Sequence, residues 1–369
     1  MSELIEIRAA NRWKLMATVS AAALLAHLHA NEARAEDTDR PTVWIELGGQ
    51  LEAINGMKDV YAAPFIVNHL NAPYNLESPL NEGQVGSAFG GEGKISFQPT
   101  GSDWILSAAV RYGRSNSKKN LHQQSTTQYR IKTGKYNKYH GYVNIPITRV
   151  SDMQATHRET HAIMDFTAGK DVGLGMFGHG SSSVLTAGVR IAQFRSQSNV
   201  AFKSLPDPHW GTIAPTTGNT QYHHHTYLAS ANIIHSFKGI GPTVSWDAAA
   251  AMVGNRADGE VTVDWGVNLA VLFGRQKVSG SHHTTGRYFK GAHYSQVLSN
   301  TPLDRRRTVA VPNVGGFAGL SVRYPNAKLS LGYRADFFFN AMDQGVDTRD
   351  AKNISFHGPF ATVSIGLGG

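Results

Sequence analysis

The 369-residue sequence contains no cysteine, and only 17% of its residues are charged. The absence of cysteine excludes a disulfide scaffold, a thiolate zinc site, an iron–sulfur cluster and a cysteine nucleophile. The low charged fraction argues against a disordered acidic or basic chain. No run of about 20 apolar residues is present, which excludes a bundle of transmembrane helices. The chain has instead 38 Gly, 16 Phe, 13 Tyr and 6 Trp, a composition that favours strands and turns.

The first 35 residues have the layout of an export signal. Arg8, Arg12 and Lys14 precede an apolar run over 15–26, and small residues follow at Ala33 and Ala35. This order predicts a secretory signal peptide cleaved after Ala35, which leaves residues 36–369 as one exported domain. The alternative is an N-terminal helix that anchors the chain to a membrane.

The remaining chain alternates between apolar and polar residues. In 260–273, Val261, Val263 and Trp265 share one face, whereas Glu260 and Thr262 share the other. The same pattern recurs in 43–53, 104–112, 183–195, 244–252, 328–339 and 361–367. Period-two alternation predicts strands with one apolar and one polar face. A strand of about 9–11 residues is long enough to cross a membrane at a tilt of about 45°.

The connections between these strands alternate in length. The long ones are 54–89, 114–153, 197–236, 275–305 and 340–352, and the short or glycine-rich ones are 99–102, 169–181, 254–258 and 325–326. We therefore expect a closed antiparallel transmembrane β-barrel of ten strands in the outer membrane of a Gram-negative bacterium, with long external loops and short periplasmic turns. If 222–236 and a partner also cross, the count is twelve. A soluble periplasmic β-sandwich is the alternative fold.

Aromatic residues near the expected strand ends suggest a girdle at the membrane interface. They are Trp44, Tyr112, Tyr324, Phe337, Phe339 and Phe356.

Several short stretches in the chain from about Ala155 onward resemble a known family. They are 185–194 (LTAGVRIAQF), 237–242 (FKGIGP), 272–274 (LFG), 331–336 (LGYRAD) and 357–360 (HGPF). They resemble the pore-forming major outer membrane proteins described from Legionella. The resemblance implies a barrel with a passive pore or a surface-structural function, and it implies no catalytic residues. The chain departs from many barrels in ending Leu367-Gly368-Gly369 rather than in an aromatic residue.

Charged residues of both signs fall on the polar faces of the predicted strands. The candidates for lining a lumen are Arg111, Asp165, Arg190, Asp247, Glu260, Asp264, Arg323, Lys328, Arg334 and Asp336. Opposed charges along a water path would bias the passage of ions. In the alternative, they form internal salt bridges that fill a narrow barrel.

The expected external loop 114–153 is strongly basic. It holds Arg114, Lys118, Lys119, Arg130, Lys132, Lys135, Lys138 and Arg149 against Asp152 alone, a net charge of 8 − 1 = +7. Such a loop would pair with lipopolysaccharide phosphates or draw small anions toward a pore; otherwise it is a solvated polar loop. Export disfavours nucleic acid as a partner.

Histidines are plentiful, but their spacing predicts no metal site and no cofactor. His157 and His161 flank Glu159 on one strand and would lie about 13 Å apart, too far to share one ion. His223–His225 and His282–His283 fall in expected loops, and no G-x-S-x-G motif is present. We therefore expect a small passive pore for solutes without catalysis. The alternatives are a non-conducting surface or adhesive protein and, third, an outer-membrane hydrolase.

Overall fold

The computed structural model describes residues 42–56, 59–60, 82–83, 88–99, 102, 104–133, 141–172, 182–210, 222–290, 293–345 and 349–367. All of them belong to one compact unit, Pro41–Gly368. The predicted signal peptide lies outside the described residues.

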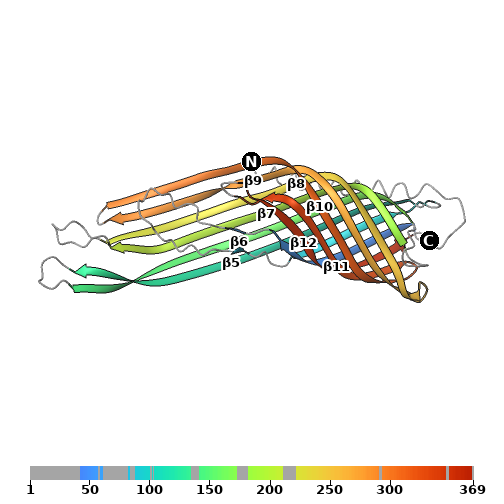
Figure 1. The fold of residues 1–369 in the computed structure, drawn as a ribbon, viewed down its shortest axis with the longest axis horizontal. Helices are drawn as coiled ribbons and strands as arrows, with labels where there is room; N and C mark the ends of the chain where they lie inside the picture. Colours follow the sequence, from blue (N-terminus) through green and yellow to red (C-terminus); the bar gives the residue numbers. More distant parts are fainter. Residues whose placement is uncertain are drawn as a thin grey trace. The chain divides into compact units, whose positions relative to one another are not determined.

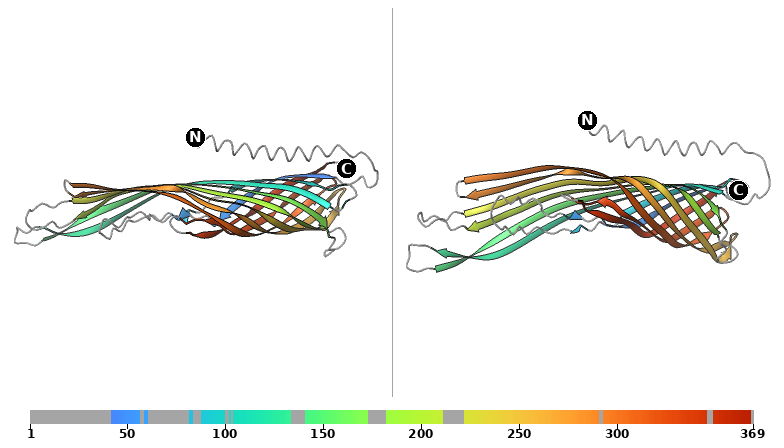
Figure 2. Two further views of the ribbon diagram at one scale, coloured as in Figure 1. Left: turned by 90° about the horizontal axis from the view of Figure 1, so that it is seen from above. Right: turned by 45° about the horizontal axis from the view of Figure 1, so that its top comes forward.

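Ten strands form one closed antiparallel barrel (Figures 1 and 2). They are β1 (Val43–Asn55), β4 (Ala88–Phe97), β5 (Trp104–Thr133), β6 (Gly141–Asp171), β7 (Ser182–Trp210), β8 (Tyr222–Asn255), β9 (Gly259–Lys290), β10 (His293–Arg323), β11 (Ala327–Asp343) and β12 (Ala351–Leu367). Sequence neighbours pair in order, and β1 closes the ring between β4 and β12. The prediction of a ten-stranded antiparallel barrel is confirmed.

The short strands β2 (Asp59–Val60) and β3 (Glu82–Gly83) pair with each other in a separate two-stranded sheet. No helix in the described part of the chain is long and apolar enough to cross a membrane.

The strands fall into two length classes. β1, β4, β11 and β12 have 10 to 17 residues, whereas β5 to β10 have 29 to 34. At about 3.3 Å per residue, the long strands measure roughly 100 Å. They therefore continue past the ends of the short strands as a six-stranded sheet, seen at the left of Figure 1. We call this sheet, made of the parts of β5–β10 beyond the ring, the extension.

The extension corrects three of the predicted loops. The segments 114–153, 197–236 and 275–305 are mostly strand, because β5 runs to Thr133, β7 to Trp210 and β9 to Lys290. Residues 222–236 continue β8 rather than adding a strand to the ring, so the count is ten and not twelve. The sequence signal is weaker there because polar residues such as His157, Ser196 and Ser198 interrupt the apolar inner face, which reduces the period-two contrast.

Alternation sorts the barrel side chains as predicted. On β9, Val267, Leu269, Val271 and Phe273 are exposed on the outside, while Asp264 is buried inside. Exposed large apolar side chains recur at outward positions of all ten barrel strands next to the short turns, such as Leu106 on β5 and Leu331 on β11. They form a continuous apolar belt around the turn end of the barrel.

The turn between β8 and β9 shows how local sequence fixes one end of the barrel. Gly254 and Gly259 adopt φ values of 94° and 116°, a region that favours glycine. Between them, the Asn255 side-chain oxygen accepts a hydrogen bond of 2.9 Å from the Asp258 amide. The predicted short turn at 254–258 therefore forms with the residues that its backbone requires.

In the extension, the face that continues the barrel interior is apolar. Met153, Val200, Phe202, Ile233 and Val278 belong to one buried cluster there. This face is contributed by β6, β7, β8 and β9. The extension thus has its own hydrophobic core, separate from the cluster inside the ring.

Candidate functional site: the filled lumen

The predicted lumen residues lie on the inner face of the barrel, where most of them are paired. Arg190 donates two hydrogen bonds to Asp165, of 2.7 and 2.9 Å, and another of 2.6 Å to Asn268. Arg111 bonds the buried Asp336, and Arg334 bonds Glu92. A bidentate arginine–carboxylate pair is geometrically restrictive, so these cations are held against the wall rather than extended into a water path.

A second charged group surrounds Asp264 near the short turns. Its carboxylate accepts hydrogen bonds from Ser321 at 2.6 Å and Thr262 at 2.9 Å. Arg323 lies 3.1 Å away and Lys328 is also in contact. One buried carboxylate therefore joins two cations and two hydroxyls, which satisfies it inside the barrel.

The two remaining predicted lumen residues are placed differently. Glu260 pairs with the exposed Arg256 of the turn at 3.5 Å. Asp247 lies against Gly266, where a Cβ atom would overlap its carboxylate. The ten residues thus form several separate groups rather than one continuous ring of charge.

Farther from the short turns than these ion pairs, the lumen is filled by apolar side chains. Phe194, Phe237, Phe338, Met342 and Ile354 are fully buried there, each with at most 1% of its surface exposed. The complete cluster, which we call the plug, also holds Ile54, Ala88, Ile163, Ala192, Ala270, Leu272, Val311, Ala341 and Phe356. Every barrel strand except β5 contributes to the plug.

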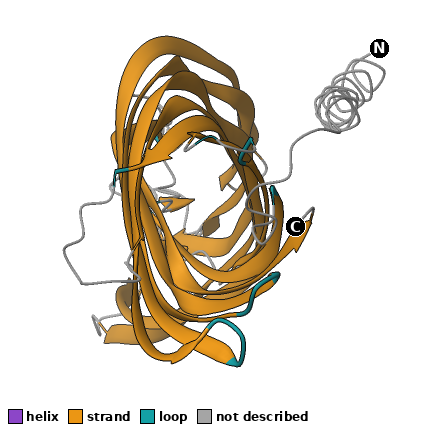
Figure 3. Cartoon of the chain, turned by 90° about the vertical axis from the view of Figure 1, so that its right-hand side faces the viewer, coloured by secondary structure: helices purple, strands orange, loops and turns teal. Residues whose placement is uncertain are grey.

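The plug joins opposite walls of the barrel. Phe194 on β7 and Phe356 on β12 lie five strands apart in either direction around the ring, yet their ring centroids are 5.4 Å apart. Phe194 also meets Phe338 edge to face at 4.7 Å and stacks on Phe237 at 5.6 Å. The ring of strands is oval in Figure 3, a section in which side chains can meet across the short axis.

The plug also corrects one aromatic prediction. Phe356 was expected in the interfacial girdle, but only 3% of it is exposed and it faces inward. It is paired in register with the inward Asp336, so the pleat places it on the lumen side. Tyr112, Tyr324, Phe337 and Phe339 are exposed.

A buried polar relay on β6 and β7 lies beside the plug. His157 Nδ1 lies 2.9 Å from Ser198 Oγ, and His157 Nε2 lies 2.6 Å from Glu159 Oε1. His161, the inward residue that follows Glu159 on β6, is 3.2 Å from Glu52 of β1, and its ring is tilted against that of Phe356 with centroids 4.0 Å apart. No group of three or more metal-ligating side chains occurs among the described residues. The alternation His-x-Glu-x-His predicts that His157, Glu159 and His161 share one face of a strand. The serine that contacts His157 comes from a neighbouring strand, which local spacing does not indicate.

Asp343 lies at the rim of the barrel as the last residue of β11, a strand of 17 residues that begins at the short turn 325–326. Its carboxylate accepts hydrogen bonds from Arg305 at 2.7 Å and from the amides of Gly345 and Asp350 at 3.1 and 3.0 Å. Burial alone would raise the pKa of Asp343, but these hydrogen bonds and the Arg305 charge outweigh it and lower that pKa.

The predicted basic loop is redistributed over strands. Arg114, Lys118, Lys119, Arg130 and Lys132 lie on β5, and Arg149 lies on β6. Lys135 and Lys138 lie outside the described residues.

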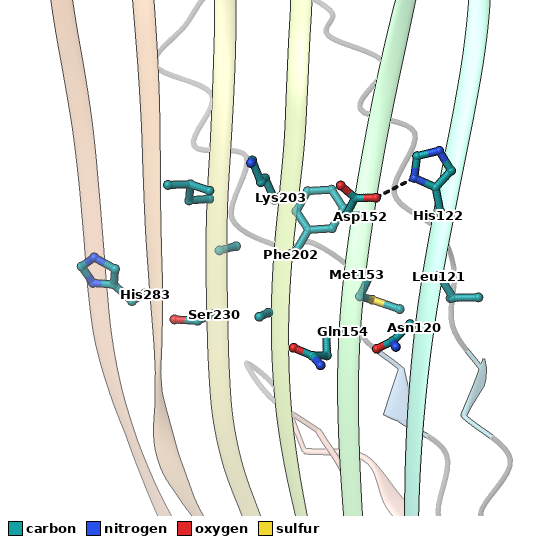
Figure 4. A pocket seen from close by; sticks show the side chains of 13 residues that line it. Asn120, Leu121, His122, Asp152, Met153, Gln154, Phe202, Lys203, Ser230 and His283 are labelled. Carbon is teal, nitrogen blue, oxygen red and sulfur yellow. Dashed lines mark hydrogen bonds and ion pairs between the residues drawn. The ribbon is translucent and has the colours of Figure 1, made fainter.

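A groove of about 580 Å³ crosses the extension from β5 to β9. Figure 4 shows His122, Asp152 and Lys203 side by side on neighbouring strands, with His283 at the other end. His122 and Asp152 form an ion pair of 2.6 Å, but each side chain is more than half exposed. Such a pair contributes little binding energy of its own, so the groove is a weaker candidate site than the lumen.

Comparisons with known proteins add little to this geometry. No family model matches the chain, and no curated protein matches it. Among solved structures, the transport unit of the autotransporter AIDA-I from Escherichia coli is 6% identical, with 91% of this chain and 93% of that chain covered and a TM-score of 0.23. The outer-membrane expressed OmpT of Vibrio cholerae is 9% identical, with 91% and 100% covered and a TM-score of 0.14. Since neither TM-score reaches 0.5, the description of this chain depends on its own structure.

Proposed function

We propose that the protein is an integral outer-membrane β-barrel with a closed lumen, which acts at the cell surface through its extension rather than by conducting solutes. The single observation that carries this proposal is the plug, in which Phe194 and Phe356 meet across the barrel. The proposal places the alternative of a non-conducting surface or structural protein ahead of the passive pore.

Membrane insertion is supported by the apolar belt. Side chains such as Leu47, Phe273 and Leu331 expose more than half of their surface on the outside of the barrel. Contiguous apolar surface of this extent marks contact with another apolar phase. Closing the sheet leaves no unpaired strand edge within the belt, which a lipid environment requires. The short turns would face the periplasm and the extension would face outward.

Closure of the lumen is supported by packing and charge together. The plug offers no polar group to solvate an ion, and hydrophobic constrictions close pores by excluding water. Below it, Arg190 and Arg111 are engaged by carboxylates rather than lining a water path. A ten-stranded barrel is close to the size at which side chains fill the interior.

Conductance in planar bilayers tests the proposal. We expect no discrete conductance steps from the folded wild-type protein. The double variant F194A/F356A removes both sides of the contact across the barrel and should introduce steps. The matched control F273A/F337A removes two outward phenylalanines, 58% and 45% exposed, and should stay silent. Steps from the wild-type protein that persist unchanged in F194A/F356A would overturn the closed lumen and favour the pore.

Hydrolysis is a second candidate, favoured by one observation. The contacts Ser198–His157–Glu159 have the order nucleophile, base and orienting acid. The test is turnover of ester or phospholipid substrates by wild-type protein and by S198A. Turnover that disappears in folded S198A would support catalysis, whereas equal turnover in the two proteins would assign the relay to packing.

A further inference from the structure

We propose that the outer surface just above the apolar belt binds the phosphate groups of the phosphorylated glycolipid in the outer leaflet. This inference rests on the proposed membrane insertion. The binding surface, which we call the cationic band, consists of Arg114, Arg158, Arg195, Lys238, Arg275 and Lys277. These residues lie on the five consecutive strands β5 to β9.

Register places the six cations on one face and close together. Lys238 is paired directly with Arg275, and Lys277 is the next residue on that face of β9. Arg195 is paired with Ser236, which in turn is paired with Lys277. Neighbouring strands are about 4.8 Å apart, and alternate residues on a strand are about 6.6 Å apart. Three or four cationic side chains can therefore reach one diphosphorylated headgroup.

The height of the band matches that of a lipid headgroup. On three strands, a cation is the first outward residue above the last exposed apolar side chain of the belt. The steps are Tyr112 to Arg114, Ile240 to Lys238, and Phe273 to Arg275. Each step rises about 6.6 Å along the strand, so the charges lie where the hydrocarbon ends and the phosphates begin.

The charge balance of this surface favours an anion. Register pairing aligns the outward residues of β5 to β10 in rows that cross the strands. Three adjacent rows contain the band, and they run from Tyr112, Arg114 and Asn116 on β5 to Thr308, Arg306 and Asp304 on β10. Together these rows hold seven cations and one carboxylate. The seventh cation, Arg306, bonds that carboxylate, Asp304, at 2.9 Å. Lys238 and Arg275 lie directly opposite each other in register, so positive charge is concentrated at this point of the surface.

Phosphate is the anion that fits best. Arginine can donate two parallel hydrogen bonds to a phosphate, and lysine adds a compact charge. The exposed aromatic rings of Tyr112 and Phe273 just below would contact acyl chains of the same lipid molecule. A free anion would use the charges but not the rings, so a lipid explains both features.

Lipid titration followed by native mass spectrometry tests this inference. The detergent-folded full-length protein is titrated with diphosphorylated lipid A, with lipid A stripped of both phosphates, and with phosphatidylglycerol. The test variant K238Q/R275Q/K277Q loses three band charges. The control K118Q/K203Q/R256Q also loses three exposed charges, but these lie on the extension and on the periplasmic turn. Heat-modifiable migration on a gel verifies folding of each protein.

Wild type and control should bind diphosphorylated lipid A about ten- to hundredfold more tightly than the test variant, as expected for three exposed charge pairs. Removing the phosphates should have a similar effect, and the preference should weaken at high salt. Equal binding with and without phosphates would overturn the inference, even if the test variant fails to fold. Phosphatidylglycerol bound as tightly as lipid A would overturn the assignment to glycolipid. A wild-type protein that does not enter vesicles would instead contradict the proposed membrane insertion.

Discussion

Replacing Phe194 with alanine should measure how much the plug stabilises the barrel. Phe194 has no exposed surface and meets three other rings at 4.7 to 5.6 Å. Truncation of a fully buried phenylalanine costs about 3–5 kcal/mol, because transfer energy is lost and a cavity remains. Its ring neighbours on β8, β11 and β12 cannot collapse into the space without moving the strands, so we expect a value in the upper half of this range.

The assay is equilibrium unfolding in urea with the protein inserted in lipid vesicles, monitored by tryptophan fluorescence. The matched control is F273A, the same chemical change at an outward position that is 58% exposed. Lipid chains can fill the space left there, so the control should cost only about 1 kcal/mol. An F194A protein no less stable than F273A would show that the plug is not packed as described, and the closed lumen would lose its support.

Three further perturbations address other parts of the barrel. In D343N, the free energy of unfolding should fall at pH 7, because the lowered pKa of Asp343 stabilises the fold above its unfolded pKa of about 3.9. The difference from wild type should vanish as the pH drops through the lowered folded pKa, as urea titrations in pH series would show; a constant difference would contradict the Arg305 pairing. In G113A, the new Cβ would overlap His161, so thermal melting should occur at lower temperature, while G91A, where the space is open, should melt like wild type. R190M should cost about 3–5 kcal/mol by leaving buried polar partners unsatisfied; a cost below about 1 kcal/mol in the same urea assay would refute the pairing.

The ring and its inner face could be predicted because each depends on local pattern. Alternation over 260–273 or 328–339 needs only neighbouring residues, and the pleat then fixes which side chains share a face. Turn residues such as Gly254 and Gly259 mark the short connections for the same local reason. The placement of Arg190 or Asp336 on the inner face therefore follows from parity alone.

The plug could not be predicted in this way. Parity placed Phe338 on the inner face together with Asp336, but it does not say how far apart opposite walls lie. Whether Phe194 faces water or contacts Phe356 depends on the width and shape of the barrel cross-section. These are set by strand tilt and stagger around the whole ring. The contact between His157 and Ser198 could not be predicted for a related reason, since these two register partners are 41 residues apart in sequence.

The basic segment 114–133 shows how a correct observation led to an incomplete structural reading. Its lysines and arginines lie on β5, whose pairing with β4 ends at Arg114, so among the described strands the rest of β5 pairs only with β6. β10 forms the other edge of the extension, because its pairing with β11 begins at Asn313, and it carries Arg305, Arg306 and Arg307.

An edge strand that projects into solvent exposes unpaired amides and carbonyls, and lysine or arginine along it opposes pairing with the edge of another chain. The four inner strands β6 to β9 are paired on both sides and need no such protection. The excess charge that suggested a basic external loop is therefore explained by an open sheet edge. Five of the six cations of the cationic band lie instead on the inner strands β6 to β9, which have no edge to protect. Edge protection therefore does not account for them, whereas the proposed lipid ligand does.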